Sequence, residues 1–310
     1  MAAMSASGFE LAVGQPFRFT RCLGYMTRSP LESLYEVCEG KIIRLVAVAS
    51  ETEQGTTPGR SLLLEISCPD DQVLQVRFLQ GEPGSESELE SVKRYIRDWF
   101  DLDRDLGPWQ KLTDGDPVLR VLAERLYGLR IIGIPDLFEA LCWAIVGQQV
   151  NLAFAYKLKA RLTEAYGEST LWEGRTYRRF PEPAALAGVD VAELQALQLT
   201  RAKAAAVLET AALMRRGELS RDKLLALGDF DAAERELVRI RGIGPWTAHY
   251  VRMRCLRDPR AFPIGDAGLQ NAVRKLLGMD RKPTPSELQQ LFANWAGWEA
   301  YATFYLWNNY

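Results

Sequence analysis

The chain has 310 residues, a length greater than that of one average domain. Of these residues 47% are hydrophobic, which is enough to form a large buried core. A formal net charge of -2 and a pI near 5.8 exclude a protein that binds nucleic acid through a uniformly basic surface. Any nucleic-acid site must therefore be local.

The cysteines and the start of the chain bear on where the protein works. Five cysteines stand at irregular spacings, with no CxxC pair and no Cys/His zinc pattern: Cys22, Cys38, Cys68, Cys142 and Cys255. This usage predicts reduced thiols. Residues 1–9 carry no signal-peptide pattern, and no stretch approaches about 20 uninterrupted apolar residues. We therefore expect a protein that is not secreted and not in a membrane: cytoplasmic and nucleoid-associated, or nuclear in a eukaryote.

Residues 1–107 predict an α+β domain whose last part links into a helical core. Three stretches have strand character and are expected to be neighbours in an antiparallel sheet: 42–49, 61–66 and 74–78. After a Pro83-Gly84 turn, apolar residues recur at helical spacing from Leu89 to Trp99. The charged segment 101–116 then marks the expected boundary.

From residue 108 to residue 310 strand signals nearly vanish, and helix is expected to follow helix. Asp136 and Glu139 form a capping-box pattern at the start of one of these helices. At its end, Gly147, Gln148 and Gln149 form a polar break before the next helix. The sequence therefore predicts an all-helical core over residues 108–310.

A hairpin between two helices spans residues 237–256. An amphipathic helix meets Gly242-Ile243-Gly244, and a new helix starts at Pro245, where proline suits the first turn. Such a hairpin directs backbone N–H groups outward beside a helix N-terminus, which suits a DNA phosphate, while Ile243 enters the core. An ordinary interhelix turn with a glycine C-cap is the alternative. Seven Lys/Arg residues against three acids in 241–280 favour phosphate, although such runs are more often solvated helix faces.

Asp266 lies in the loop 262–268, at the expected start of a further helix. An aspartate in this position is typically an N-cap. By residue-type preference alone, capping is the commoner role and catalysis the rarer one.

Together these segments resemble the helix-hairpin-helix (HhH-GPD) DNA glycosylase superfamily, and within it the 3-methyladenine DNA glycosylase II (AlkA-type) branch. The similarity covers about residues 95–310 and follows the family's order: Gly128-Leu-Arg-Ile-Ile, Pro135-Asp-Leu-Phe-Glu-Ala-Leu, Ile145-Val-Gly-Gln-Gln-Val, Tyr166-Gly-Glu, the hairpin, Asp266 and Trp295-Ala-Gly-Trp298-Glu-Ala-Tyr301. It implies a mainly α protein, with a two-lobed helical core preceded by a small antiparallel-sheet domain. The implied activity is flipping of an alkylated base from duplex DNA and hydrolysis of its N-glycosidic bond in base excision repair.

The resemblance gives Asp266 the catalytic role. A fixed carboxylate stabilises the positive charge that develops on the sugar and can orient the attacking water. One carboxylate oxygen is expected to cap the helix while the other faces the sugar. Relatives that also cleave the DNA backbone carry a lysine nucleophile where this chain has Trp246. Without that amine no Schiff base forms, so a monofunctional enzyme without AP-lyase activity is implied.

The resemblance also assigns residues that contact DNA. Gln148, Trp246, Tyr250 and Trp298 would line the base pocket, where aromatic faces can bind a cationic base such as 3-methyladenine or 7-methylguanine, although any one aromatic is more often core. Gln149 would wedge into the vacated stack, although glutamine is also an ordinary turn residue. Contacts with the DNA backbone would come from the hairpin and the residue before it: Arg241, Gly242, Ile243 and Gly244. His249 is expected at the surface or on a phosphate, not in catalysis.

The implied partner is double-stranded DNA containing damaged bases, bound by a monomer. No metal site formed by side chains is expected, but the hairpin carbonyls could hold Na⁺ or K⁺. An iron–sulfur cluster is excluded, because no cysteine follows Cys255. Two alternatives stay open: the same fold acting on deaminated or oxidised bases, and a non-catalytic helix-hairpin-helix DNA-binding module.

Overall fold

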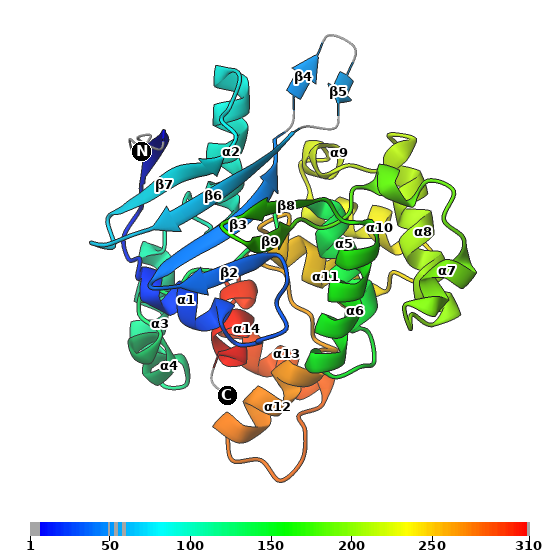
Figure 1. Cartoon of the computed structure of the whole chain (residues 1–310). Coiled ribbons are helices and arrows are strands. Elements are labelled where there is room, and N and C mark those ends of the chain that lie inside the picture. Colours follow the sequence, from blue (N-terminus) through cyan, green and yellow to red (C-terminus); the bar gives the residue numbers. More distant parts are fainter. Residues whose placement is uncertain (1–6, 49, 53–54, 58–59, 309–310) are drawn as a thin grey trace.

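The computed structural model describes residues 7–48, 50–52, 55–57 and 60–308. Figure 1 shows a twisted sheet on one side of the molecule and helices around and beside it. The mainly α architecture with a small antiparallel sheet near the N-terminus, predicted from the sequence, is confirmed. In the described part of the chain no helix is both long and apolar enough to span a membrane.

Five antiparallel strands form the N-terminal sheet in the order β1-β7-β6-β3-β2. Their bounds are β1 (Gly8–Ala12), β2 (Tyr35–Cys38), β3 (Lys41–Ala47), β6 (Ser61–Ser67) and β7 (Val73–Gln80). The three predicted strands are β3, β6 and β7, and they are neighbours as expected; Ala49, at the end of the first prediction, lies outside the described residues. A short ribbon of β4 (Ser50–Thr52) and β5 (Gly55–Thr57) extends from the sheet (Figure 1).

Alternation along the strands explains which face of the sheet is buried. Leu74, Val76 and Phe78 of β7 point into the core, while Gln75 and Arg77 between them are exposed. Helices α1 (Phe19–Met26) and α2 (Glu86–Trp99) share this core. The predicted helix from Leu89 to Trp99 is α2, which begins one turn earlier because Ser85 caps it through the amide of Glu88.

Two hydrophobic clusters define two lobes. The first contains the sheet, α1, α2, α3 (Gly107–Gly115), α4 (Leu119–Arg125), α12 (Ala267–Leu276), α13 (Pro285–Ala293) and α14 (Glu299–Trp307). The second contains α5 (Leu137–Gly147), α6 (Leu152–Tyr166), η1 (Pro183–Leu186), α7 (Val191–Ala196), α8 (Arg201–Arg215), α9 (Arg221–Ala226), α10 (Phe230–Val238) and α11 (Pro245–Arg254). The first cluster joins the sheet to helices on both sides of residue 107, and Trp109 of α3 packs there on Tyr301 and Tyr305 of α14.

One β-hairpin interrupts the helical core, which the expectation of an all-helical core missed. Strands β8 (Ser169–Trp172) and β9 (Arg175–Arg178) pair across Glu173 and Gly174, whose φ angles of 47° and 76° are those of a tight hairpin turn. Buried Tyr177 packs against Leu45 and Leu63 of the sheet. This short hairpin is stabilised by a partner from the N-terminal part of the chain, which local sequence cannot reveal.

A buried ionic cluster joins the lobes where a capping box was predicted. Asp136 does cap α5 through the amide of Glu139 at 2.6 Å, and burial raises the pKa of the Asp136 carboxyl to about 6. The Glu139 side chain, however, turns away to Arg44 of β3 at 2.9 Å and to Lys159 of α6 at 3.7 Å. Lys159 also pairs with Glu32 at 3.0 Å. The capping box is therefore only half formed, because Glu139 compensates buried cations.

Candidate active site

A pocket of about 1340 Å³ opens where three segments meet: the α5–α6 loop, the loop before α11, and the start of α12. The first two segments come from the second lobe, and the third comes from the first lobe. The volume is above that of most small-molecule sites, which leaves room for a nucleotide with its sugar. The site is therefore built between the lobes.

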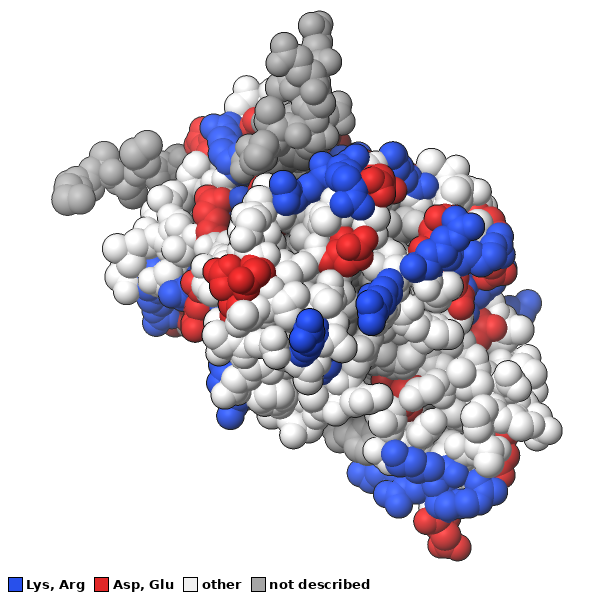
Figure 2. Space-filling view, turned by 90° about the vertical axis from the view of Figure 1, so that its right-hand side faces the viewer, with Lys and Arg blue, Asp and Glu red and all other residues white. Residues whose placement is uncertain are grey.

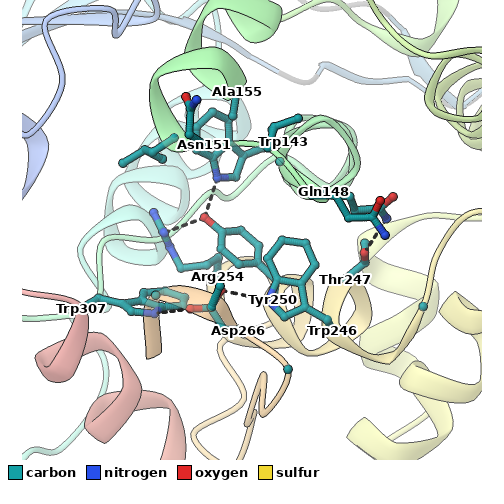
Figure 3. A pocket seen from close by; sticks show the side chains of 18 of the residues that line it. Trp143, Gln148, Asn151, Ala155, Trp246, Thr247, Tyr250, Arg254, Asp266 and Trp307 are labelled. Atoms are coloured by element: carbon teal, nitrogen blue, oxygen red, sulfur yellow. Dashed lines mark hydrogen bonds between the residues drawn. The ribbon is translucent and has the colours of Figure 1, made fainter. Parts of the chain in front are cut away.

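Asp266 lies on the wall of this pocket as the N-cap of α12. Its Oδ1 accepts hydrogen bonds from the Leu269 amide at 2.6 Å and from the Trp307 indole N–H at 2.9 Å, and its Oδ2 accepts from the Trp246 indole N–H at 3.0 Å. Figure 3 shows the two hydrogen bonds from the indoles. Oδ1 therefore caps the helix as predicted, and both oxygens also accept from an indole. Each carboxylate oxygen has about two lone-pair sites, so Oδ2 can still accept one further hydrogen bond.

The loop around Asp266 is shaped by glycine. A Cβ added to Gly268 would lie 3.0 Å from Asp266 Oδ1 and 3.7 Å from the Trp307 ring. That spacing is tight, so a side chain at position 268 would displace the carboxylate or the indole. The Asp-Ala-Gly order at 266–268 is thus a local signal that the sequence analysis did not use.

Four aromatic side chains line the pocket: Trp143, Trp246, Tyr250 and Trp307. The Tyr250 ring packs 5.8 Å from Trp246 and 6.0 Å from Trp307, measured between ring centroids. Trp246 and Tyr250 were predicted, and they lie here with Gln148. Trp143 and Trp307 were not predicted, because nothing in the sequence separates them from the other aromatics of α5 and α14.

Trp298 does not line this pocket, so its predicted place there needs correction. It packs 5.9 Å from Trp109 and 5.5 Å from Tyr301 in the core of the first lobe. Trp298 precedes α14 and Trp307 ends it, which puts the two indoles at opposite ends of the helix. Of these two tryptophans, Trp307 is the one that lines the pocket, where it donates to Asp266.

The α5–α6 loop is tied to both neighbouring elements. Buried Lys203 of α8 donates from Nζ to the carbonyls of Val146 at 2.8 Å and Gln148 at 2.7 Å. The Gln148 side chain donates to the Gly242 carbonyl and to Thr247 Oγ1, both at 2.9 Å. Gln149, the predicted wedge, is exposed with a φ of 54°. The anchored loop thus holds Gln149 with its side chain exposed.

The predicted hairpin lies between α10 and α11, and Pro245 occupies the first turn of α11 as expected. Gly242 has a φ of 93° and faces Ala206 so closely that a Cβ would approach within 2.7 Å. Ile243 is buried, and its amide donates to the Ile240 carbonyl at 3.0 Å, so this amide is not directed at a phosphate. Gly244 caps α11 without a side chain, which leaves the first-turn amides for a ligand. Arg241 is exposed beside them.

Three of the seven cations in the basic segment 241–280 are not exposed: Arg252, Arg254 and Arg257. Arg252 is buried against Asp258 at 2.6 Å and also pairs with Asp231 and Glu234. Arg257 pairs with Asp98 at 2.6 Å and Asp101 at 2.8 Å. The other four are exposed: Arg241, Arg260, Arg274 and Lys275. Figure 2 shows Lys and Arg side chains gathered at the lower end of the molecule.

His249 is half-buried and holds the loop that leads to Asp266, not a free surface position. Its Nδ1 accepts from the Phe262 amide at 3.1 Å, and its Nε2 lies 3.4 Å from Glu234. Arg252, Asp231 and Asp258 also face it, and burial lowers the pKa of His249 below its usual value of 6.5. The neutral ring therefore joins α11 to the segment before α12.

This arrangement predicts acid sensitivity. Between the lowered pKa of folded His249 and 6.5, the unfolded chain binds more protons than the folded one. The contribution of His249 to the free energy of unfolding should be complete above about pH 6.5. It should be lost as the pH falls from there through the lowered pKa of the folded state. Urea unfolding from pH 7.5 to pH 5 should show a smaller decrease in His249→Gln than in the wild type. Equal pH slopes would contradict this role.

A helical hairpin that borders an interlobe pocket, with an aspartate capping the next helix on the pocket wall, is the arrangement of a base-excision DNA glycosylase. Comparison with known families agrees. The family described as HhH-GPD superfamily base excision DNA repair protein matches residues 142–297, and the 8-oxoguanine DNA glycosylase N-terminal domain matches residues 10–141. The chain belongs to the HhH-GPD superfamily and is a DNA glycosylase.

Individual relatives are similar over nearly the full chain. A DNA-3-methyladenine glycosylase of Bacillus subtilis (strain 168) is 45% identical over 286 residues, which are 92% of this chain and 91% of that one. DNA-3-methyladenine glycosylase 2 of Escherichia coli (strain K12) is 33% identical over 293 residues, 94% of each chain. The structure of a 3-methyladenine DNA-glycosylase from Archaeoglobus fulgidus matches with a TM-score of 0.78 at 22% identity over 97% of each chain, which shows a shared fold.

Proposed function

We propose that the enzyme removes alkylated bases of the 3-methyladenine and 7-methylguanine type from duplex DNA by hydrolysis, without cutting the strand. The observation that carries this proposal is a carboxylate, Asp266, held by two indole N–H groups on the wall of an aromatic pocket. The similarity to two DNA-3-methyladenine glycosylases supports the substrate class.

The chemistry follows from the position of Asp266. As the N-glycosidic bond lengthens, positive charge develops on the sugar, and a carboxylate already fixed by three donors stabilises this charge without reorganising. The remaining lone-pair site of Oδ2 can orient the attacking water. An alkylated purine is cationic and leaves readily, so the site needs no strong general acid. The products are a free base and an abasic site.

Cleavage of the strand would need an amine nucleophile, and here the first turn of α11 presents Trp246 to the pocket. In the part of the pocket lining that the structure describes, no lysine is present. An enzyme without that amine cannot form a Schiff base with the sugar. We therefore infer base removal without AP-lyase activity.

DNA would be held by the hairpin and opened by Gln149. Gly244 and the uncapped first turn of α11 suit a phosphate next to the flipped nucleotide, with Arg241 beside them. Exposed Gln149 can enter the gap left in the stack. Hairpin, wedge and pocket all come from one chain, so we infer that a monomer is sufficient.

The hairpin carbonyls also fit a monovalent cation. The carbonyls of Ile240 and Gly242 each accept one hydrogen bond and retain a second lone pair. Together with neighbouring carbonyls they would hold Na⁺ or K⁺, which would add positive charge beside the phosphate.

The proposal is tested by incubating methylated duplex DNA with the protein and separating the released bases. We expect 3-methyladenine and 7-methylguanine to appear, with strand breaks only after alkali. Breaks without alkali would contradict the monofunctional assignment. If neither base is released, the same assay on hypoxanthine and 8-oxoguanine duplexes would identify a different lesion class, and no release at all would favour a DNA-binding module.

A further inference from the structure

Two arginines that were not predicted as site residues line the pocket: Arg28 and Arg254. Arg254 is buried, and its guanidinium donates to the Ile132 carbonyl at 2.6 Å and to the hydroxyls of Tyr25 and Tyr250 at 2.8 Å. Figure 3 shows the Tyr250 hydroxyl directed toward Arg254 and Trp143, while Asp266 lies beside Trp246 and Trp307. The pocket therefore has a carboxylate side and a guanidinium side.

Arg28 is the more accessible of the two cations. It follows α1, is exposed to solvent, and its guanidinium lies 4.1 Å from the centroid of the Tyr25 ring. Its Nε donates to the Tyr156 hydroxyl at a long 3.3 Å. Among the described residues no carboxylate oxygen lies within 4.0 Å of a side-chain nitrogen of Arg28 or Arg254, whereas Arg252 and Arg257 are ion-paired. Arg28 thus has donor capacity that the protein itself does not use.

The Tyr250 hydroxyl adds a further donor. Its oxygen accepts from Trp143 Nε1 at 2.7 Å and from Arg254 at 2.8 Å. With two hydrogen bonds accepted, the hydroxyl proton remains to be donated. This side of the pocket therefore presents donors and positive charge to a ligand. A pocket selected only for cationic bases would not carry two guanidinium groups, because they repel such bases.

We propose that Arg28 is a specificity-determining residue that favours 6-oxopurines, such as 7-methylguanine and hypoxanthine, over the 6-aminopurine 3-methyladenine. This assignment rests on the proposed function. With the sugar at Asp266, a purine extends away from the carboxylate, and its 6-substituent lies on the edge remote from the sugar. A 6-oxo oxygen accepts hydrogen bonds from Arg28 and Tyr250, whereas a 6-amino group meets these donors as another donor and leaves them unpaired.

The test uses Arg28→Met and a methylated duplex that contains both lesions. Both methylated nucleosides are cationic, so the ratio of 7-methylguanine to 3-methyladenine release cancels charge repulsion and any general loss of activity. We expect Arg28→Met to lower this ratio about tenfold, the effect of one hydrogen bond to a charged group. Single-turnover release of hypoxanthine, a neutral 6-oxopurine, should fall by a similar factor.

Two further variants serve as controls. Arg21→Met removes an exposed arginine of α1 outside the pocket and should leave the ratio unchanged. Arg28→Lys keeps a cationic donor and should give a ratio between those of the wild type and Arg28→Met. Equal losses of both bases in Arg28→Met would overturn the specificity role and indicate a structural or phosphate contact. Failure of the wild type to release either base would instead overturn the proposed function, and with it this assignment.

Discussion

Replacement of Asp266 by asparagine is expected to lower the rate of base release at least a hundredfold, while duplex DNA still binds. Asparagine keeps one side-chain oxygen, which can still accept from the Leu269 amide and from Trp307, so α12 should begin as before. What is lost is the negative charge facing the sugar, and removal of one fixed group that stabilises a transition state typically lowers kcat by about 10² to 10³.

The measurement is single-turnover release of 7-methylguanine, combined with the Kd for a duplex that carries an uncleavable abasic-site analogue. Asp280→Asn is the matched control, because Asp280 is exposed after α12 and lies outside the pocket lining. A variant at position 266 with wild-type release would remove Asp266 from the mechanism. A variant that neither releases bases nor binds DNA would indicate a folding defect, which thermal unfolding would detect.

Replacement of Glu139 by glutamine should lower the free energy of unfolding more than replacement of His249 or Glu168. Glu139 is 4% exposed and compensates Arg44 at 2.9 Å and Lys159 at 3.7 Å, both of which are also buried. In the variant, Glu32 still pairs with Lys159 at 3.0 Å. Arg44 loses the negative charge of the carboxylate to which it donates. Breaking a buried ion pair in this way lowers the free energy of unfolding by about 3–5 kcal/mol.

Urea denaturation at pH 7.5 measures this loss. Glu168→Gln is the control, because Glu168 pairs with Arg179 at 2.5 Å but is 46% exposed, and such pairs contribute less than about 1 kcal/mol. Similar small losses of unfolding free energy in both variants would show that Glu139 does not stabilise the fold by pairing with Arg44 and Lys159. A large loss in Glu139→Gln alone would support the cluster as the ionic link between the lobes.

Part of the site could be predicted from local sequence. The Gly-Ile-Gly hairpin and Asp266 were found because their residue types are required locally: a positive φ at Gly242, a proline in the first turn of α11, and an N-cap before α12. The family resemblance then gave Trp246 and Tyr250, which stand on the same helix as the hairpin. Neighbouring positions on one helix keep a fixed relation whatever the rest of the chain does.

Trp307 and Arg28 were missed for the opposite reason. Arg28 follows the first helix and Trp307 ends the last, so only the packing of the first lobe against the second brings them to a pocket built around α11. The same holds for Trp298, whose sequence context matched the family but whose indole packs on Trp109.

By itself, the sequence determined the helical class, the three central strands of the sheet, the hairpin, and the position of Asp266, because periodicity, capping and glycine conformation act over a few residues. Only the tertiary structure decided where the lobes divide, that β8 and β9 pair over the sheet, and which side chains complete the pocket. These features depend on contacts between residues far apart in the chain, and such contacts leave no periodic signal in a single sequence.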